Sequence, residues 1–150
     1  LFQGEGYLIP APAVVDSAET KHALLERCGL AAIFEMADKL DVALLSVGGI
    51  STLTTSYRTG YITEADRRSL IEAGGVGDVL YNFIGANGDI LNHEVNSRVI
   101  SANLARLRKT PERVLISGGK DKLIALRAAI KTVLPTTFVT DEQTALALIG

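Results

Sequence analysis

The hydrophobic and polar positions along the chain alternate between short apolar runs and stretches with apolar residues at helical spacing. Short apolar runs are typical of buried strands, and helical spacing indicates helices that pack one face on a core. Near the end of the chain the runs RVLIS and TTFVT are each followed by such a helical stretch. Strand, helix, strand, helix at this spacing predicts a right-handed parallel crossover, and therefore an α/β fold.

Three further helices are predicted in the first half of the chain. The pattern indicates a helix over 17–28, ended by Gly29, and a second helix over 30–39. The third begins in TEADRRSLIEAGG, where Thr63 can cap the helix and Asp66 sits at the third helical position. Strong local signals of this kind place helix starts without any tertiary information.

Two segments between these helices predict strands. The run DVALLSV, which starts at Asp41, is unbroken and apolar, as in a parallel strand that is covered on both faces. The stretch DVLYNFIGANGDIL has apolar arms around Asn87-Gly88, a pair that suits a tight hairpin turn. The expected fold is thus a Rossmann-like, mostly parallel sheet with flanking helices and a β-hairpin insertion.

The amino-acid composition indicates a single globular domain and argues against a nucleic-acid-binding, disulfide-bonded or zinc-binding one. The chain has 150 residues, 47% of them hydrophobic, which is enough to build one well-packed domain. Its net charge is −2, so it lacks the basic surplus of a nucleic-acid-binding domain, and any contact with DNA is expected from another region. Cys28 is the single cysteine, and His22 and His93 lie far apart, so neither a disulfide nor a zinc site is expected.

The apolar runs and the first residues of the chain indicate where in the cell the protein is expected. No run reaches the roughly 18 apolar residues of a membrane span, and no signal peptide is visible, so a cytoplasmic protein is expected. The start LFQG is similar to the remnant of a tag-removal site, and the alternative is that these are native loop residues. We therefore take 1–4 as a tag remnant and 5–150 as the domain.

A glycine turn follows the first predicted strand. In SVGGIST, Gly48 and Gly49 leave the backbone accessible, and Ser51 and Thr52 add hydroxyls that can donate to an anion. In open α/β sheets, ligands bind beyond the carboxyl ends of strands. The alternative is a turn that serves chain geometry alone.

A second glycine pair follows the strand RVLIS. The stretch ISGGKDK lacks the spacing of a nucleotide P-loop, and it is not a dinucleotide fingerprint either. It does place a helix N-terminus at the end of a strand, where free N–H groups favour an anion. Lys120 and Lys122 oppose the helix dipole there, which suggests either a bound anion or two well-screened surface lysines.

Two isolated charged residues complete the candidates. Asp78 could accept hydrogen bonds from sugar hydroxyls, or it could bond its own turn backbone. Arg58 could bind phosphate through its planar guanidinium, or it could be a surface arginine. No arrangement of His, Cys and Ser supports nucleophilic catalysis.

Several of these motifs, taken in order, resemble a known family. The stretches LIPAPAVVDSAE, DVALLSVGGIST, YRTGYIT, AGGVGDVLYNFIGANGDILNHEVNSRVIS, RVLISGGKDKLIALRAAI and TTFVTDEQTALAL are similar to the effector-binding domain of SorC-type bacterial transcription regulators. The likeness covers about residues 6 to 149. It implies a fold akin to sugar-phosphate isomerases without catalysis, a phosphorylated sugar or polyol as effector, and no cofactor. It also implies a dimer or tetramer, and a helix-turn-helix domain that precedes this region.

The resemblance assigns roles position by position. It places Lys122 near the ligand phosphate and Asp78 at the sugar hydroxyls. Arg58 and the turn of Gly48, Gly49 and Ser51 are expected to contribute to the same site. It also covers Asn96 and Arg98, but assigns them no role.

The family's domain begins earlier than this chain, with a strand and a phosphate-binding loop that are not found here. The chain therefore looks like the later part of a sugar-phosphate effector-binding domain. Its sheet is expected either to lack its first strands or to be completed by another chain. The alternative function is a sugar-phosphate isomerase-like enzyme in which Asp78 acts as base and Lys122 as electrophile. A binding domain with no regulatory role is a third interpretation.

Overall fold

The computed structural model describes residues 3–51 and 54–150. Two residues of the predicted tag remnant, Leu1 and Phe2, lie outside the described part, and so does Thr52 of the predicted glycine turn. The helices are α1 Ala18–Arg27, α2 Leu30–Ala37, α3 Thr55–Arg58, α4 Glu64–Glu72, α5 Glu94–Ser97, α6 Leu104–Leu107, the 3-10 turn η1 Lys120–Lys122, α7 Leu123–Val133 and α8 Glu142–Ile149. The strands are β1 Val42–Leu45, β2 Val47–Gly48, β3 Gly75–Val79, β4 Asn82–Gly85, β5 Glu112–Ile116 and β6 Thr137–Val139.

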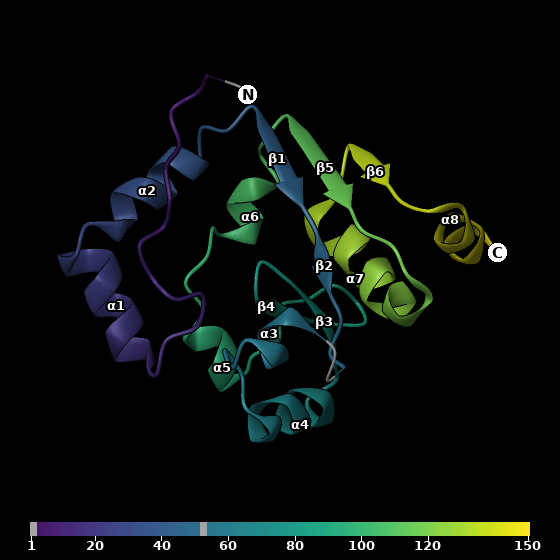
Figure 1. The fold of residues 1–150 in the computed structure, drawn as a ribbon, viewed down its shortest axis with the longest axis horizontal. Helices are drawn as coiled ribbons and strands as arrows, with labels where there is room; N and C mark the ends of the chain where they lie inside the picture. Colours follow the sequence, from purple (N-terminus) through teal and green to yellow (C-terminus); the bar gives the residue numbers. More distant parts are fainter. Residues whose placement is uncertain (1–2, 52–53) are drawn as a thin grey trace.

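The strands form two small sheets that meet at Ser46 (Figure 1). The first sheet has the order β1-β5-β6 and all of its strand pairs are parallel. The second has the order β2-β3-β4 and is antiparallel. The chain therefore leaves the parallel sheet at the end of β1 and enters the hairpin sheet as β2, which confirms the mixed α/β fold with a hairpin insertion.

Helix α7 joins the two sheets into one core. Its buried residues Ala125, Leu126, Ala128, Ala129 and Val133 share an apolar cluster with residues of β1, β5, β2, β3 and β4. Gly77 in β3 permits this approach, because a Cβ there would lie 2.5 Å from the Cβ of Ala125. The close packing of α7 on β3 fixes where the residues just before the helix, including η1, must lie.

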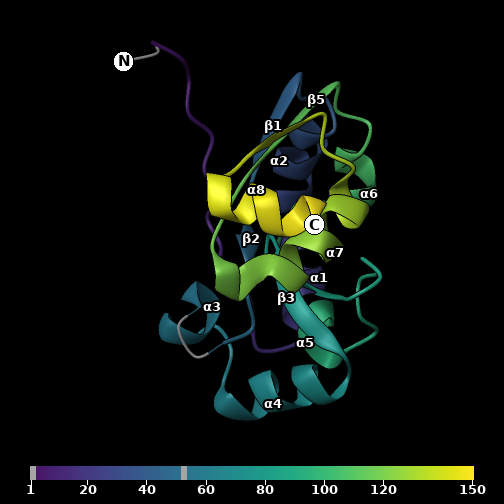
Figure 2. The same cartoon turned by 90° about the vertical axis from the view of Figure 1, so that its right-hand side faces the viewer.

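The predicted helix starts are confirmed. Ser17 caps α1 through a hydrogen bond from the Thr20 N–H, and Gly29 follows the helix at φ 77°. Thr63 and Asp66 form a complete capping box at the start of α4. In Figure 1 and Figure 2 this helix lies at the opposite end of the molecule from the parallel sheet.

The hairpin turn lies seven residues before the predicted position. Strands β3 and β4 are joined through Leu80 and Tyr81, which have φ values of 51° and 62°. The Asn87-Gly88 turn also forms, but it connects β4 to an isolated bridge between Ile84 and Ile90. Asn-Gly pairs favour a left-handed turn, but the register of β3 with β4, which pairs Val79 with Asn82, places the closing turn at Leu80-Tyr81.

The prediction that both faces of the first strand are covered does not hold within the described part of this chain. Ala43 and Leu45 are buried, but Val42 and Leu44 are 49% and 69% exposed. Ile116 of β5 and Val139 of β6 are also exposed. The parallel sheet is thus packed on one face against the core, while its other face presents apolar side chains in the described part of the chain.

Candidate functional site

A pocket of about 380 Å³ opens where β1 passes into β2, beside α3, the β3–β4 turn and η1. It lies beyond the carboxyl ends of β1 and β5, the usual place for a ligand in an open α/β sheet. Its lining residues are Ser46, Val47, Gly48, Gly49, Ser51, Thr54, Thr55, Ser56, Asp78, Leu80, Tyr81, Asp121 and Lys122.

Asp78 occupies the inner wall of this pocket. It pairs with Gly48 across the β2–β3 ladder, and its side chain would overlap any Cβ at position 48, at 2.0 Å from Oδ1. Its Oδ2 accepts a hydrogen bond from the Tyr81 N–H at 2.9 Å. Burial raises the pKa of Asp78 to about 6, against the opposing effects of the Tyr81 hydrogen bond and the charge of Lys122.

Lys122 is the cationic residue of the pocket. It ends η1 and is half-buried, whereas Lys120 in the same turn is exposed and does not line the pocket. Its charge acts on Asp78, which opposes the effect of burial on that carboxyl. The pocket therefore presents the carboxyl group of Asp78 together with the ammonium group of Lys122. This arrangement suits a ligand that carries both hydroxyls and an anionic group.

The glycine pair before Lys122 has a different function from the one near Asp78. The Gly119 N–H donates to Thr144 Oγ1 at 2.9 Å, and a Cβ at Gly118 would lie 2.2 Å from Asp141 Oδ2. Both glycines thus allow the β5–η1 connection to pack against the start of α8. The glycines of ISGGKDK thus serve the packing of the chain, and of its two lysines Lys122 lines the pocket while Lys120 is exposed.

The structure brings together most of the predicted site residues. Gly48, Gly49, Ser51, Asp78 and Lys122 all line the one pocket, although they come from three separate segments. It does not bring Arg58 there: this residue ends α3, is exposed and is not among the lining residues.

Sequence reasoning missed the hydroxyl wall formed by Thr54, Thr55 and Ser56. Ser56 is buried, and its Oγ lies 3.3 Å from Thr54 Oγ1, which donates to the Ser51 carbonyl at 2.9 Å. The cluster of hydroxyl residues directly after the glycine turn was a signal that could have indicated this wall. The turn residues Leu80 and Tyr81 carried no signal, because their position depends on the register of the hairpin.

Asn96 has a structural role. Its carboxamide donates to the carbonyls of Phe83 and Leu91, at 2.9 and 2.8 Å, and accepts from the Phe83 N–H at 2.8 Å. A single side chain thus satisfies three backbone groups of β4 and the following loop.

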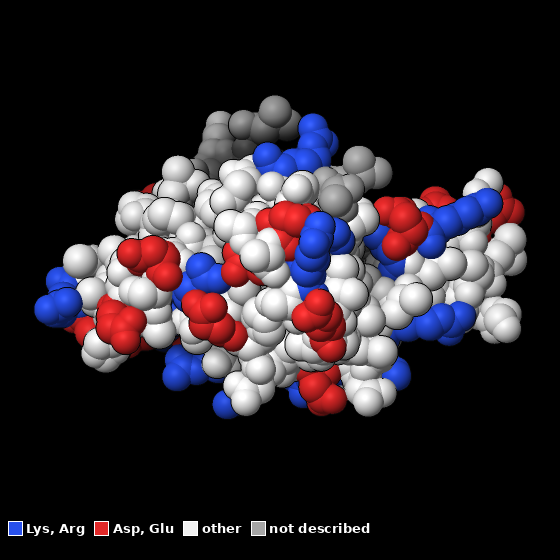
Figure 3. Space-filling model, turned by 90° about the horizontal axis from the view of Figure 1, so that it is seen from below, with Lys and Arg blue, Asp and Glu red and all other residues white. Residues whose placement is uncertain are grey.

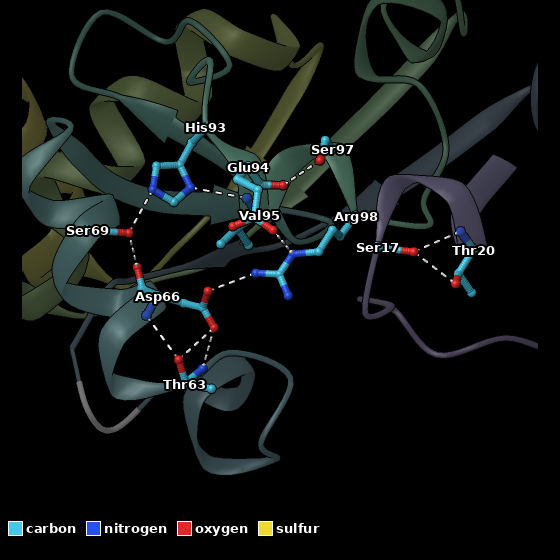
Figure 4. Close-up of polar contacts among 10 residues, drawn as sticks. All are labelled: Ser17, Thr20, Thr63, Asp66, Ser69, His93, Glu94, Val95, Ser97 and Arg98. Carbon is cyan, nitrogen blue, oxygen red and sulfur yellow. Dashed lines mark hydrogen bonds and ion pairs between the residues drawn. The ribbon is translucent and has the colours of Figure 1, made fainter.

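Arg98 joins α5 to α4 (Figure 4). It pairs with Asp66 at 2.8 Å and with Glu94 at 3.2 Å. Burial would raise the pKa of Asp66, but hydrogen bonds from Thr63 and the charge of Arg98 outweigh this and lower it. Asn96 and Arg98, to which the resemblance assigned no role, therefore hold α5 against β4 and against α4.

Three further observations concern surface charge, metal ligands and membrane-spanning helices. The face shown in Figure 3 has acidic and basic side chains interspersed, without a sector of one sign. Within residues 3–51 and 54–150, no three His, Cys, Asp or Glu side chains are placed to hold a metal ion. Over the same ranges, no helix is long and apolar enough to cross a membrane.

Comparison with known proteins identifies the fold and the family. The family model described as "Putative sugar-binding domain" matches residues 1–150. The chain belongs to this family. Its fold is shared by solved structures of a DeoR family regulator and of the sorbitol operon regulator SorC. The resemblance given by its ordered motifs is therefore confirmed.

Individual members of the family align over almost all of the chain. The deoxyribonucleoside regulator of Bacillus subtilis is 29% identical over 99% of this chain and 47% of its own length. The erythritol catabolism regulatory protein EryD of Brucella abortus is 30% identical over 96% of this chain and 45% of its own. A DeoR family transcriptional regulator from Listeria monocytogenes superimposes with a TM-score of 0.88 at 28% identity, over 95% of this chain and 57% of that one. The chain thus spans about half the length of the curated relatives it matches.

Proposed function

We propose that the pocket binds a phosphorylated sugar or polyol as an effector. The observation that carries this proposal is the meeting of Asp78 and Lys122 in one pocket, beside an open glycine turn, in a chain of the sugar-binding domain family. A carboxylate and an ammonium group in one pocket match the two parts of such a ligand. The carboxylate accepts hydrogen bonds from its hydroxyls, and the ammonium group attracts its anionic phosphate.

Each residue has a specific part in this proposal. Lys122 pairs with the phosphate, and Asp78 accepts hydrogen bonds from sugar hydroxyls. Gly48 and Gly49 let the ligand approach the backbone, and Ser51 adds a hydroxyl. Arg58 stays a predicted phosphate contact that would have to reach the pocket from the exposed end of α3.

The role in regulation concerns the intact protein. We propose that the effector binds one domain or quaternary arrangement better than another, and so changes operator affinity through that difference. DNA binding through a helix-turn-helix domain outside this chain, a dimer or tetramer, and a cytoplasmic location belong to the same proposal. Its support is that the relatives named above are regulators of about twice this length.

Titration of the intact protein with a panel of sugar and polyol phosphates tests the pocket. With the compound that binds best, Lys122→Ala should weaken affinity by about tenfold or more, because a charge-assisted contact to phosphate is lost. Lys120→Ala is the matched control, since this exposed lysine lies two residues away and should have no effect. Unchanged affinity in both Lys122→Ala and Asp78→Asn would show that the ligand binds elsewhere.

The same titrations separate the regulator from the enzyme. Incubation with the bound sugar phosphate should return it unchanged, as judged by NMR of the mixture. Steady turnover that is abolished by Asp78→Asn would instead favour the isomerase-like alternative, in which Asp78 acts as base.

A further inference from the structure

The β3–β4 turn has an unusual backbone for its residues. Leu80 and Tyr81 both lie in the left-handed region, with φ values of 51° and 62°. Two-residue hairpin turns of this kind normally use Asn and Gly, because bulky side chains disfavour positive φ. Strain of this kind persists where the surrounding structure or the function compensates for it.

The core explains Leu80 but not Tyr81. Leu80 packs against the main apolar cluster, which includes β1, β5 and α7. Tyr81 is half-buried, and its ring packs edge-on against Tyr61, with centroids 5.4 Å apart and an interplanar angle of 76°. It is not part of any of the three apolar core clusters. The strained position therefore serves something other than the core.

Tyr81 instead belongs to the pocket. It is a lining residue next to Asp78, whose Oδ2 accepts the Tyr81 N–H and so holds the turn against the pocket wall. Burial raises the pKa of the Tyr81 phenol, as do Tyr61 and the charge of Asp78, so the ring lies within the electrostatic reach of the acid. The turn thus places an aromatic side chain beside the residue proposed to bind hydroxyls.

We propose that Tyr81 is a specificity-determining residue, whose ring packs against the carbon skeleton of the sugar or polyol while Lys122 holds the phosphate. This inference rests on the proposed function of the pocket. An aromatic ring offers a flat apolar face for the C–H groups of a sugar, and its hydroxyl can bond a polar neighbour. Tyr81 should therefore select for the carbon chain of the ligand, and should contribute nothing to the binding of phosphate alone.

The test uses two probes, inorganic phosphate and ribose 5-phosphate, titrated into the intact protein. Tyr81→Gly removes the ring and relieves the strain, so its Tm without ligand should equal or exceed that of the wild type. Its affinity for ribose 5-phosphate should fall at least tenfold, while its affinity for inorganic phosphate stays within twofold. Tyr81→Phe keeps the ring and should bind both probes as the wild type does.

Leu134→Gly is the matched control for strain. Leu134 also has a positive φ, 49°, but it caps α7 and does not line the pocket. Its substitution should raise or preserve Tm and leave the affinity for both probes unchanged. If Tyr81→Gly does not fold, Tyr81→Asn takes its place, because asparagine tolerates the left-handed region.

The outcomes separate the two proposals. Lys122→Ala should weaken binding of both probes, and no effect on either would reject the pocket as the phosphate site together with the inference that rests on it. If Lys122→Ala acts as expected, then equal losses for both probes in Tyr81→Gly, or no loss for ribose 5-phosphate, would overturn the role of Tyr81 alone.

Discussion

At the scale of single residues, the pocket depends on Asp78 and the missing side chain of Gly48. The carboxyl is buried in the pocket wall and occupies the space that a Cβ at position 48 would need. Burial also determines its charge, because it raises the pKa to about 6 although Lys122 acts in the opposite direction. The proposed ligand site is therefore built at some cost in stability.

That cost gives a pH-dependent prediction for Asp78→Asn. The pKa is raised from 3.8 in the unfolded chain to about 6 in the folded protein, so the folded state favours the protonated acid. Stability is lost as pH rises from about 4 to about 6, and the penalty above that range is on the order of 2–3 kcal/mol. The neutral amide avoids it, so Asp78→Asn should raise Tm at pH 7.5 and raise it markedly less at pH 4.5, measured without ligand. Asp89→Asn, at an exposed acid, is the control for the loss of one negative charge.

The close contact of Gly48 predicts a difference between two neighbouring glycines. Gly48→Ala should destabilise the protein by about 1–3 kcal/mol, because the new methyl group displaces Asp78. Gly49→Ala is the control, since a Cβ there meets Thr54 and Lys122 only at 3.8 and 3.9 Å. Denaturant unfolding curves measure both, and equal midpoints for the two variants would contradict the packing of Asp78 against position 48.

At the scale of elements, some features could be predicted from local sequence, whereas others depend on tertiary contacts. The α4 capping box could be predicted from Thr63 and Asp66, because both partners lie within one turn of helix. The hairpin turn could not, because its place follows from the register of β3 with β4, together with the hydrogen bond from the Tyr81 N–H to Asp78. The same holds for Asn96, whose three partners lie 5 and 13 residues away.

Asn96 provides the prediction at this scale. Asn96→Ala removes three hydrogen bonds to the backbone of Phe83 and Leu91. The Phe83 N–H loses its side-chain acceptor, while the two carbonyls keep the bonds from the Leu91 and His93 N–H groups. We expect a loss of about 2–4 kcal/mol in the free energy of unfolding, measured by chemical denaturation. The exposed Asn87 is the control, and Asn87→Ala should cost much less. A loss no larger than that of the control would mean that α5 and β4 are held together by apolar packing alone.

At the scale of the whole molecule, one face of the parallel sheet β1-β5-β6 leaves apolar side chains exposed to solvent. Val42, Leu44, Ile116 and Val139 are all exposed on it. Because the chain spans about half the length of its relatives, we propose that the rest of the protein covers this face.

Leu44→Gln tests this cover. In the intact protein the change should lower the free energy of unfolding by about 1.5–3 kcal/mol, the value of burying one leucine side chain. In the 150-residue chain alone it should have little effect, because Leu44 is 69% exposed. Leu8→Gln, in the exposed segment before α1, is the control and should be neutral in both proteins. Equal effects of Leu44→Gln in the two proteins would show that the face stays open.

The sequence by itself determined the α/β class, the helix starts and the candidate residues Gly48, Gly49, Ser51, Asp78 and Lys122. These follow from periodicity, capping and strand-end position, which act over a few residues, and from the ordered motifs of the family. Only the tertiary structure decided that these residues share one pocket, that Arg58 lies outside it, and that Tyr81 lies within it. The physical reason is that side chains from distant segments meet only after the register of the hairpin and the packing of α7 are fixed.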